Sequence, residues 1–122
     1  MAKKKVLIID DDQDILETTG ALLGYEGFEV YSADTVEEGM KMIDEVEPDI
    51  ILLDIMFPEK KTRGFDAASE IKAKHPHLPI LALTAINREY AFDFAKEDIQ
   101  AEEFINKPVE TERLIELINK YV

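Results

Sequence analysis

Short apolar runs recur along this chain and predict the strands of a sheet. Val6–Ile9 and Ile50–Leu53 are unbroken aliphatic runs, and Ile80–Ala85 is apolar at five of its six positions. Runs of this length are too short for helices and are typical of strands buried on both faces of a parallel sheet. Phe28–Ser32, which alternates weakly, and Glu103–Asn106 complete a set of five predicted strands.

Between these runs the apolar residues recur about every 3.6 positions, which predicts helices. Asp12 or Asp14 can cap a first helix that carries Ile15 and Leu23 on its inner face. The remaining predicted helices follow the capping box Thr35–Glu38, run from Phe65 to His75-Pro76-His77, and span Asn87–Asp98 and Thr111–Tyr121.

Five strands that alternate with five helices predict an α/β fold, a doubly wound five-stranded parallel sheet with right-handed crossovers. In the common five-stranded arrangement the strand order is 2-1-3-4-5, so the first strand lies beside the third. The 122 residues fit one domain, large enough to bury a core without metal or disulfide staples. We expect a single domain over residues 1–122.

The charge of the chain limits its partners. Fourteen Lys and Arg against 27 Asp and Glu give a formal net charge of −13, which should repel nucleic acid and anionic membranes. No apolar run approaches the roughly 20 residues that span a bilayer, and the absence of cysteine agrees with a reducing compartment. We therefore expect a soluble cytoplasmic protein that binds neither nucleic acid nor membrane directly.

Four of the five predicted strands end in a residue with chemical function. Asp10 and Asp11 follow the first strand, Asp54 the third, Thr84 ends the fourth, and Lys107 follows the fifth. Each has an ordinary structural explanation, since an acid after a strand can cap the next helix and a threonine suits a strand. Because ligands bind beyond the carboxyl ends of parallel strands, the set together predicts one pocket.

Three carboxylates in one pocket call for a cation. At about 5 Å, two such charges repel by about 3 kcal/mol at an effective dielectric constant near 20. Lys107 supplies only one positive charge, and His75 and His77 are expected on the surface beside Pro76. A hard divalent cation, most simply Mg²⁺, is therefore expected. A carboxylate, a metal, a hydroxyl and a lysine together suit a phosphoryl group.

These residues, in this order, resemble the receiver domain of bacterial two-component response regulators. The resemblance spans nearly the whole chain and includes Ile9-Asp10-Asp11, Leu53-Asp54 with Pro58 four residues on, Thr84-Ala85 and Lys107-Pro108. It implies a flavodoxin-like (βα)5 fold and a single receiver domain without an output domain in this chain. It also implies a signalling phosphoacceptor that assists its own phosphorylation and dephosphorylation, and not an enzyme.

The resemblance further implies Mg²⁺-dependent transfer of a phosphoryl group to Asp54 from the phosphohistidine of a sensor histidine kinase or phosphotransfer protein. The positions it assigns are Asp10, Asp11, Asp54 and the backbone carbonyl of Met56 for Mg²⁺; Thr84, Ala85 and Lys107 for the phosphoryl oxygens; and Thr84 and Phe104 for the switch. The switch would change a surface read by a downstream protein or a missing output domain.

Three positions depart from the usual receiver pattern. Gly64 lies ten residues after Asp54, two more than is usual, so the loop 59–64 is expected to be longer. Gln100-Ala101 stands where Gly-Ala is common, and Asn106 precedes the lysine where an apolar residue or threonine is common. These changes affect the surface more than the pocket. The choice of partner is therefore the property that the resemblance predicts least.

Two alternatives remain. Asp10-Asp11-Asp12 also spells the Asp-x-Asp of haloacid-dehalogenase-like phosphohydrolases, with Thr84 and Lys107 later, but residues 108–122 lack the aspartate that this family needs, and Asp54 would be unused. The other is a phosphorylation-independent interaction module of the same fold, against which the retention of every pocket residue argues. Steady release of phosphate from a phosphomonoester would identify the hydrolase, and failure to take up a phosphoryl label the module.

Met56 and Ile86 are expected to tune the lifetime of the phosphorylated state. They lie two residues past Asp54 and Thr84, positions that border the phosphoryl site in receivers. Hydrolysis needs a water aligned behind phosphorus, which an acid or amide could hold and which neither methionine nor isoleucine can. We predict slow decay, accelerated in Met56→Asn with Ile86→Glu and timed by loss of the phosphoryl label. Unchanged decay in the double variant would contradict this role.

Overall fold

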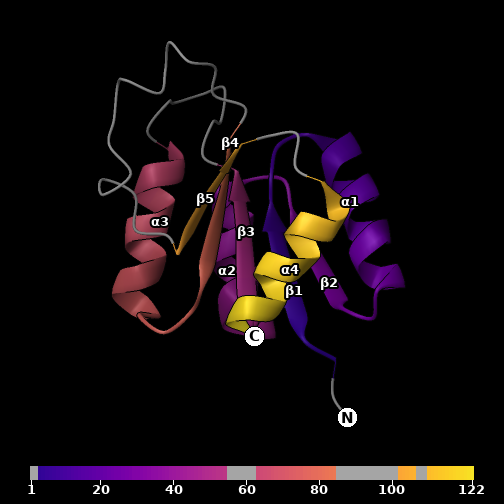
Figure 1. Ribbon diagram of the computed structural model, residues 1–122. Coiled ribbons are helices and arrows are strands. Elements are labelled where there is room, and N and C mark those ends of the chain that lie inside the picture. Colours follow the sequence, from indigo (N-terminus) through magenta and orange to yellow (C-terminus); the bar gives the residue numbers. More distant parts are fainter. Residues whose placement is uncertain (1–2, 55–62, 85–101, 107–109) are drawn as a thin grey trace.

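A five-stranded parallel sheet forms the centre of the protein, shown as a computed structural model in Figure 1. The structure describes residues 3–54, 63–84, 102–106 and 110–122, and of residues 63–67, 84, 104 and 106 only the backbone. The strands are β1 (Lys5–Ile9), β2 (Glu29–Ala33), β3 (Ile50–Asp54), β4 (Ile80–Thr84) and β5 (Glu103–Asn106). Their order is β2-β1-β3-β4-β5, which confirms the predicted α/β fold and strand order.

Helices cover both faces of the sheet (Figure 1). The described ones are α1 (Gln13–Tyr25), α2 (Val36–Val46), α3 (Arg63–Lys74) and α4 (Thr111–Tyr121). Because successive strand residues point to opposite faces, Leu7 and Ile9 pack with α2 and α3, whereas Val6 and Ile8 pack with α1 and α4. The two faces thus have separate apolar cores, as a doubly wound sheet requires.

Helix boundaries agree with the pattern at most ends. α4 has its predicted limits, and α3 ends at Lys74, before the His75-Pro76-His77 break, although it begins at Arg63, two residues before the expected start. Residues 59–62 of the expected loop and the expected helix 87–98 lie outside the described residues. None of the helices in the described part of the chain has both the length and the apolar character of a membrane span.

The second strand is shifted by one residue from its predicted position. The pattern predicts that Phe28 begins it, but the Phe28 N–H donates to the Leu23 carbonyl at 3.1 Å and closes the turn after α1. Gly27 adopts a φ of 101° in this turn, a conformation that glycine takes without strain. β2 therefore begins at Glu29, whose N–H donates to Lys4 at 2.9 Å.

Side chains at the amino ends of the strands hold β5 in register. The Glu102 carboxylate accepts hydrogen bonds from the Ile80 N–H at 2.6 Å and from the Lys72 ammonium. The Tyr121 hydroxyl donates to Glu103 Oε2 at 2.5 Å, and this hydrogen bond lowers the pKa of Glu103. β5 is thereby tied to α3, β4 and α4, and its last residue pairs with the end of β4.

Gly39 marks the closest approach of α2 to the sheet. A Cβ atom there would lie 2.5 Å from Cδ1 and 2.8 Å from Cγ1 of Ile9, which is fully buried in β1. Gly39→Ala should therefore lower the free energy of unfolding by about 1 kcal/mol, because the overpacking cost, about 1–3 kcal/mol, outweighs a helix-propensity gain of about 1 kcal/mol. Urea unfolding measures the change.

Gly24→Ala is the matched control for this substitution. Gly24 also lies in a helix, but a Cβ atom there meets nothing within 4 Å. The control should be neutral or stabilising by up to about 1 kcal/mol. If both alanine variants gained stability alike, the contact between Gly39 and Ile9 would not limit the packing of α2.

Candidate functional site

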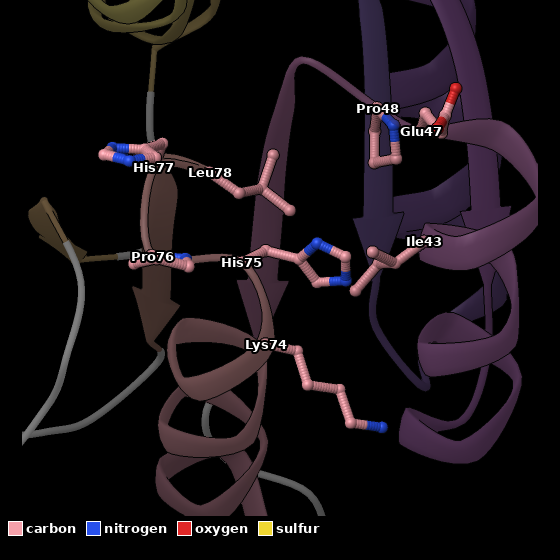
Figure 2. Close-up of a pocket in the computed structure, with 8 residues that line it drawn as sticks. All are labelled: Ile43, Glu47, Pro48, Lys74, His75, Pro76, His77 and Leu78. Atoms are coloured by element: carbon pink, nitrogen blue, oxygen red, sulfur yellow. The ribbon is translucent and has the colours of Figure 1, made fainter.

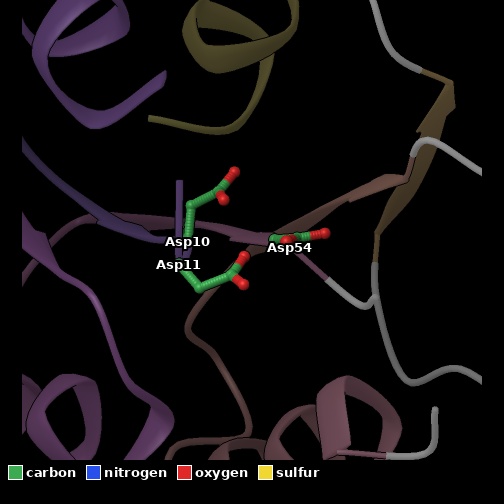
Figure 3. A group of neighbouring side chains, drawn as sticks. All are labelled: Asp10, Asp11 and Asp54. Carbon is green, nitrogen blue, oxygen red and sulfur yellow. The ribbon is translucent and has the colours of Figure 1, made fainter. Parts of the chain in front are cut away.

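Three carboxylates meet at the carboxyl edge of the sheet (Figure 3). Asp10 and Asp11 follow β1, and Asp54 is the last residue of β3. β1 and β3 are neighbours, and Ile9 pairs with Leu53, so Asp10 and Asp54 come next on adjacent strands. One carboxylate oxygen of each of the three residues lies within 4.8 Å of the others. The structure thus brings together the three acids that the sequence placed in one pocket.

Burial distinguishes these carboxylates from the rest of the acidic surface. Asp10 is 1% exposed and Asp54 is 5% exposed, and they are the buried charged residues of the described part of the chain. Asp11 is exposed and forms the open side of the group. Within the described residues every buried side-chain oxygen and nitrogen has a hydrogen-bond partner. The site is therefore two buried carboxylates with a third at the solvent boundary.

Two hydrogen bonds within the described part of the chain hold Asp10. Its backbone N–H donates to the Ala33 carbonyl at 3.1 Å, and its carboxylate Oδ1 accepts from the Asp12 N–H at 2.9 Å. Asp12 is also the N-cap of α1, which confirms one of the two predicted caps. The apolar pattern does not indicate the bond from Asp12 to Asp10. The Asp-x-Asp spacing is the signal for it, since it permits a turn in which an aspartate accepts from the backbone two residues on.

The donor set fits a hard divalent cation. Like charges within 4.8 Å repel by about 3 kcal/mol per pair at an effective dielectric constant near 20. A cation among them converts this repulsion into attraction, and carboxylate oxygens are ligands that Mg²⁺ prefers. Asp10, Asp11 and Asp54 are accordingly the described residues that could hold one.

The structure locates the backbone of two other predicted positions, Thr84 and Phe104. Thr84 ends β4 and pairs with Asn106, so both strand ends lie at the same edge as Asp54. Phe104 pairs with Ala82 inside the ladder. The other predicted positions, Met56, Ala85, Ile86 and Lys107, lie outside the described residues, as do the side chains of Thr84 and Phe104. Their assigned roles stay predictions.

A hollow of about 380 Å³ lies at the opposite end of the sheet (Figure 2). It is lined by Ile43, Glu47, Pro48, Lys74, His75, Pro76, His77 and Leu78. Pro48 precedes β3 and Asp54 ends it, so a five-residue strand, roughly 16 Å long, separates the hollow from the carboxylates. His75 is half-buried, with Nε2 3.5 Å from Asp44 Oδ1, and His77 is exposed, so neither histidine belongs to the acidic site.

Solved structures with the same fold support this arrangement. A CheY-like response regulator receiver domain protein from Methanospirillum hungatei is 29% identical with a TM-score of 0.85, over 98% of this chain and 93% of its own. Response regulator TrrA from Thermotoga maritima, solved in complex with Mg²⁺-BeF, is 30% identical with a TM-score of 0.82. The match covers 98% of this chain and 99% of TrrA. NtrX from Brucella abortus, solved with ADP, is 29% identical with a TM-score of 0.82, over 98% of this chain but 26% of NtrX.

A comparison with protein families agrees with these structures. The family model of the response regulator receiver domain matches residues 6–119, which include most of β1, the three carboxylates and most of α4. The match favours a receiver over the phosphohydrolase considered from the sequence. The chain belongs to the response regulator receiver domain family of two-component signalling.

Proposed function

We propose that Asp54 accepts a phosphoryl group from a phosphohistidine, with Mg²⁺ held by Asp10, Asp11 and Asp54. Receiver domains are the phosphoacceptors of two-component systems, and this chain is one of them. The observation that carries the proposal is the meeting of three carboxylates within 4.8 Å at the carboxyl ends of adjacent strands. The Mg²⁺-BeF complex of TrrA supports the choice of metal.

Asp54 is the carboxylate best placed to be the nucleophile. It ends the central strand of the sheet, and pairing restricts the backbone there on both sides. Leu53, just before it, pairs with Ile9 on β1, and Asp54 itself pairs with Leu83 on β4. Asp10 already uses one carboxylate oxygen to accept from Asp12, and Asp11 lies at the exposed side. The division suggests two acids that hold the metal and one that also reacts.

In the proposed reaction an Asp54 carboxylate oxygen forms a bond to phosphorus, and the bond between phosphorus and the donor's histidine nitrogen breaks. The nitrogen leaves with that electron pair, and Asp54 becomes an acyl phosphate. Bound Mg²⁺ would offset the negative charge of the carboxylates and of the phosphoryl oxygens. Asp10 and Asp11 would hold the cation beside Asp54. The burial of Asp54 strengthens these electrostatic interactions, because it excludes water.

The proposed output is a change of surface that a partner protein reads. Thr84 ends β4 beside Asn106, and Phe104 lies two residues earlier in the paired strand β5. We propose that Thr84, Ala85 and Lys107 contact the phosphoryl oxygens, and that Thr84 and Phe104 pass the change to the surface. The donor would be a sensor histidine kinase or a phosphotransfer protein.

Treatment with a small acyl phosphate and Mg²⁺ should place one labile phosphoryl group on Asp54. Asp54→Asn should abolish the label, because an amide is not a nucleophile under these conditions, and EDTA should prevent labelling of the wild type. Intact-protein mass spectrometry gives the stoichiometry, and borohydride reduction followed by peptide mapping gives the position.

Asp34→Asn is the matched control for this labelling. Asp34 is an exposed acid that follows β2 at the same edge of the sheet, with its carboxylate accepting from Gln13 at 3.2 Å. This variant should label as fully as the wild type. Labelling that survives Asp54→Asn, or that proceeds fully in EDTA, would refute the proposed function.

Asp10→Asn should stabilise the metal-free protein. The substitution removes two repulsive pairs and keeps an oxygen that can accept from the Asp12 N–H. Because the exposed side screens part of the repulsion, we expect a gain in the free energy of unfolding of about 1–3 kcal/mol. Urea unfolding in EDTA measures this gain. In saturating Mg²⁺ the wild type should be the more stable of the two, because it keeps all three proposed ligands and binding to the folded state stabilises it.

Glu116→Gln controls for the general effect of removing one acid from a chain with a net charge of −13. Glu116 is exposed on α4, with its carboxylate 3.8 Å from Arg113. Its change should stay within about 0.5 kcal/mol with or without Mg²⁺. If Asp10→Asn behaved like this control, repulsion among the three carboxylates would not be a significant cost to folding.

A further inference from the structure

Asp12 joins the first turn of α1 to the acidic site by two consecutive sets of hydrogen bonds. Its carboxylate Oδ1 accepts from the N–H groups of Asp14 at 2.9 Å and Ile15 at 3.3 Å. Its own N–H donates to Asp10 Oδ1 at 2.9 Å. The side chain of Asp12 thus holds its own backbone at the first turn of α1, and the Asp12 N–H in turn holds one oxygen of the Asp10 carboxylate.

We propose that Asp12 is a positioning residue for the Mg²⁺ site and acts through its helix cap, not through its charge. The inference rests on the proposed function, since it concerns the same site. With the cap in place, the Asp12 N–H is aimed at a buried carboxylate that has little other freedom. Without the cap, the first turn of α1 frays, and the bond that orients Asp10 is lost with it.

Two other roles for Asp12 can be separated from positioning. As a metal ligand it would have only Oδ2 to offer, because its Oδ1 already serves two N–H groups of α1. Within the described residues it also falls outside the group of carboxylates that lie close enough to share an ion. As a charge alone, it would attract the cation from the exposed surface, where salt screens the attraction.

Two conservative substitutions separate cap from charge. Asparagine is as good an N-cap as aspartate but carries no charge, whereas glutamate keeps the charge and caps poorly. Asp12→Asn should therefore retain Mg²⁺ affinity within a few fold of the wild type. Asp12→Glu should weaken it about 10–100-fold, the usual effect of losing a group that orients a metal ligand.

Thr35→Ala is the matched control for loss of a cap. Thr35 caps α2 as Asp12 caps α1, with its hydroxyl accepting from the Glu38 N–H at 3.1 Å. No metal ligand proposed here accepts a hydrogen bond from the Thr35 backbone in the described residues. Thr35→Ala should lower the melting temperature in EDTA as much as Asp12→Glu does, yet leave Mg²⁺ affinity unchanged.

The test is a calorimetric titration of the 122-residue chain with Mg²⁺ at about 0.15 M salt, where exposed charges are screened beyond roughly 8 Å. The melting temperature in EDTA is recorded for each variant. Weak binding by Asp12→Glu with near-normal binding by Asp12→Asn and Thr35→Ala supports positioning. The reverse order, with Asp12→Asn weak and Asp12→Glu normal, would overturn it in favour of charge, and equal affinity in all variants would leave Asp12 a purely structural cap.

Asp54→Asn distinguishes failure of this inference from failure of the proposed function. If the wild type binds Mg²⁺ and Asp54→Asn does not, the site is established whatever the Asp12 variants do. If the wild type and Asp54→Asn bind alike, the acidic site does not hold the ion, and both proposals fail together.

Discussion

The parallel pairing of β1 with β3 is the contact on which both the fold and the site depend. Eight aliphatic side chains, those of Val6–Ile9 and Ile50–Leu53, are at most 1% exposed in these two strands. At about 1.5–3 kcal/mol for each buried side chain, they contribute roughly 12–24 kcal/mol. Repulsion among the three acids that follow the strands, about 3 kcal/mol per pair and about 10 kcal/mol for the three pairs, is smaller. The apolar ladder therefore holds Asp10 and Asp54 together against their charges.

The two edges of the sheet use charged groups in opposite ways. At the amino edge opposite charges and carbonyls meet: the Lys5 ammonium donates to the Val46 carbonyl at 3.0 Å, and Lys72 pairs with Glu102. At the carboxyl edge like charges gather in Asp10, Asp11 and Asp54. Charged groups at the amino edge thus form hydrogen bonds and ion pairs that stabilise the fold. Those at the carboxyl edge repel one another, and a bound cation would relieve that repulsion.

The same kind of helix cap has different effects at Asp12 and at Thr35. Asp12 and Thr35 both begin a helix, and each accepts hydrogen bonds from the first turn. Only at Asp12, among these two, does the capping residue also donate to a buried acid of the site. Stability of α1 and orientation of Asp10 are therefore coupled, so a change in the first turn of α1 reaches the acidic site directly.

The helices and strands could be predicted from the sequence, because their signals are local. Continuous aliphatic runs marked β1 and β3, and the spacing in Thr111–Tyr121 marked α4 with its observed limits. Acids directly after strands also identified Asp10, Asp11 and Asp54 as candidates, since parallel strands end at one edge. The predicted start of β2 is wrong by one residue, because the Phe28 N–H donates to the turn after α1. The apolar pattern does not show which acceptor an N–H binds.

The spacing of the site residues depends on contacts between segments distant in sequence. The adjacency of β1 and β3, which sets the 4.8 Å spacing of the carboxylates, comes from packing across more than forty residues and had to be assumed from a common strand order. The bond from Asp12 to Asp10 depends on the backbone geometry of one turn, which composition does not specify. The local pattern predicts which residues lie at the carboxyl edge of the sheet. Which of them lie close together depends on the long-range pairing of the strands.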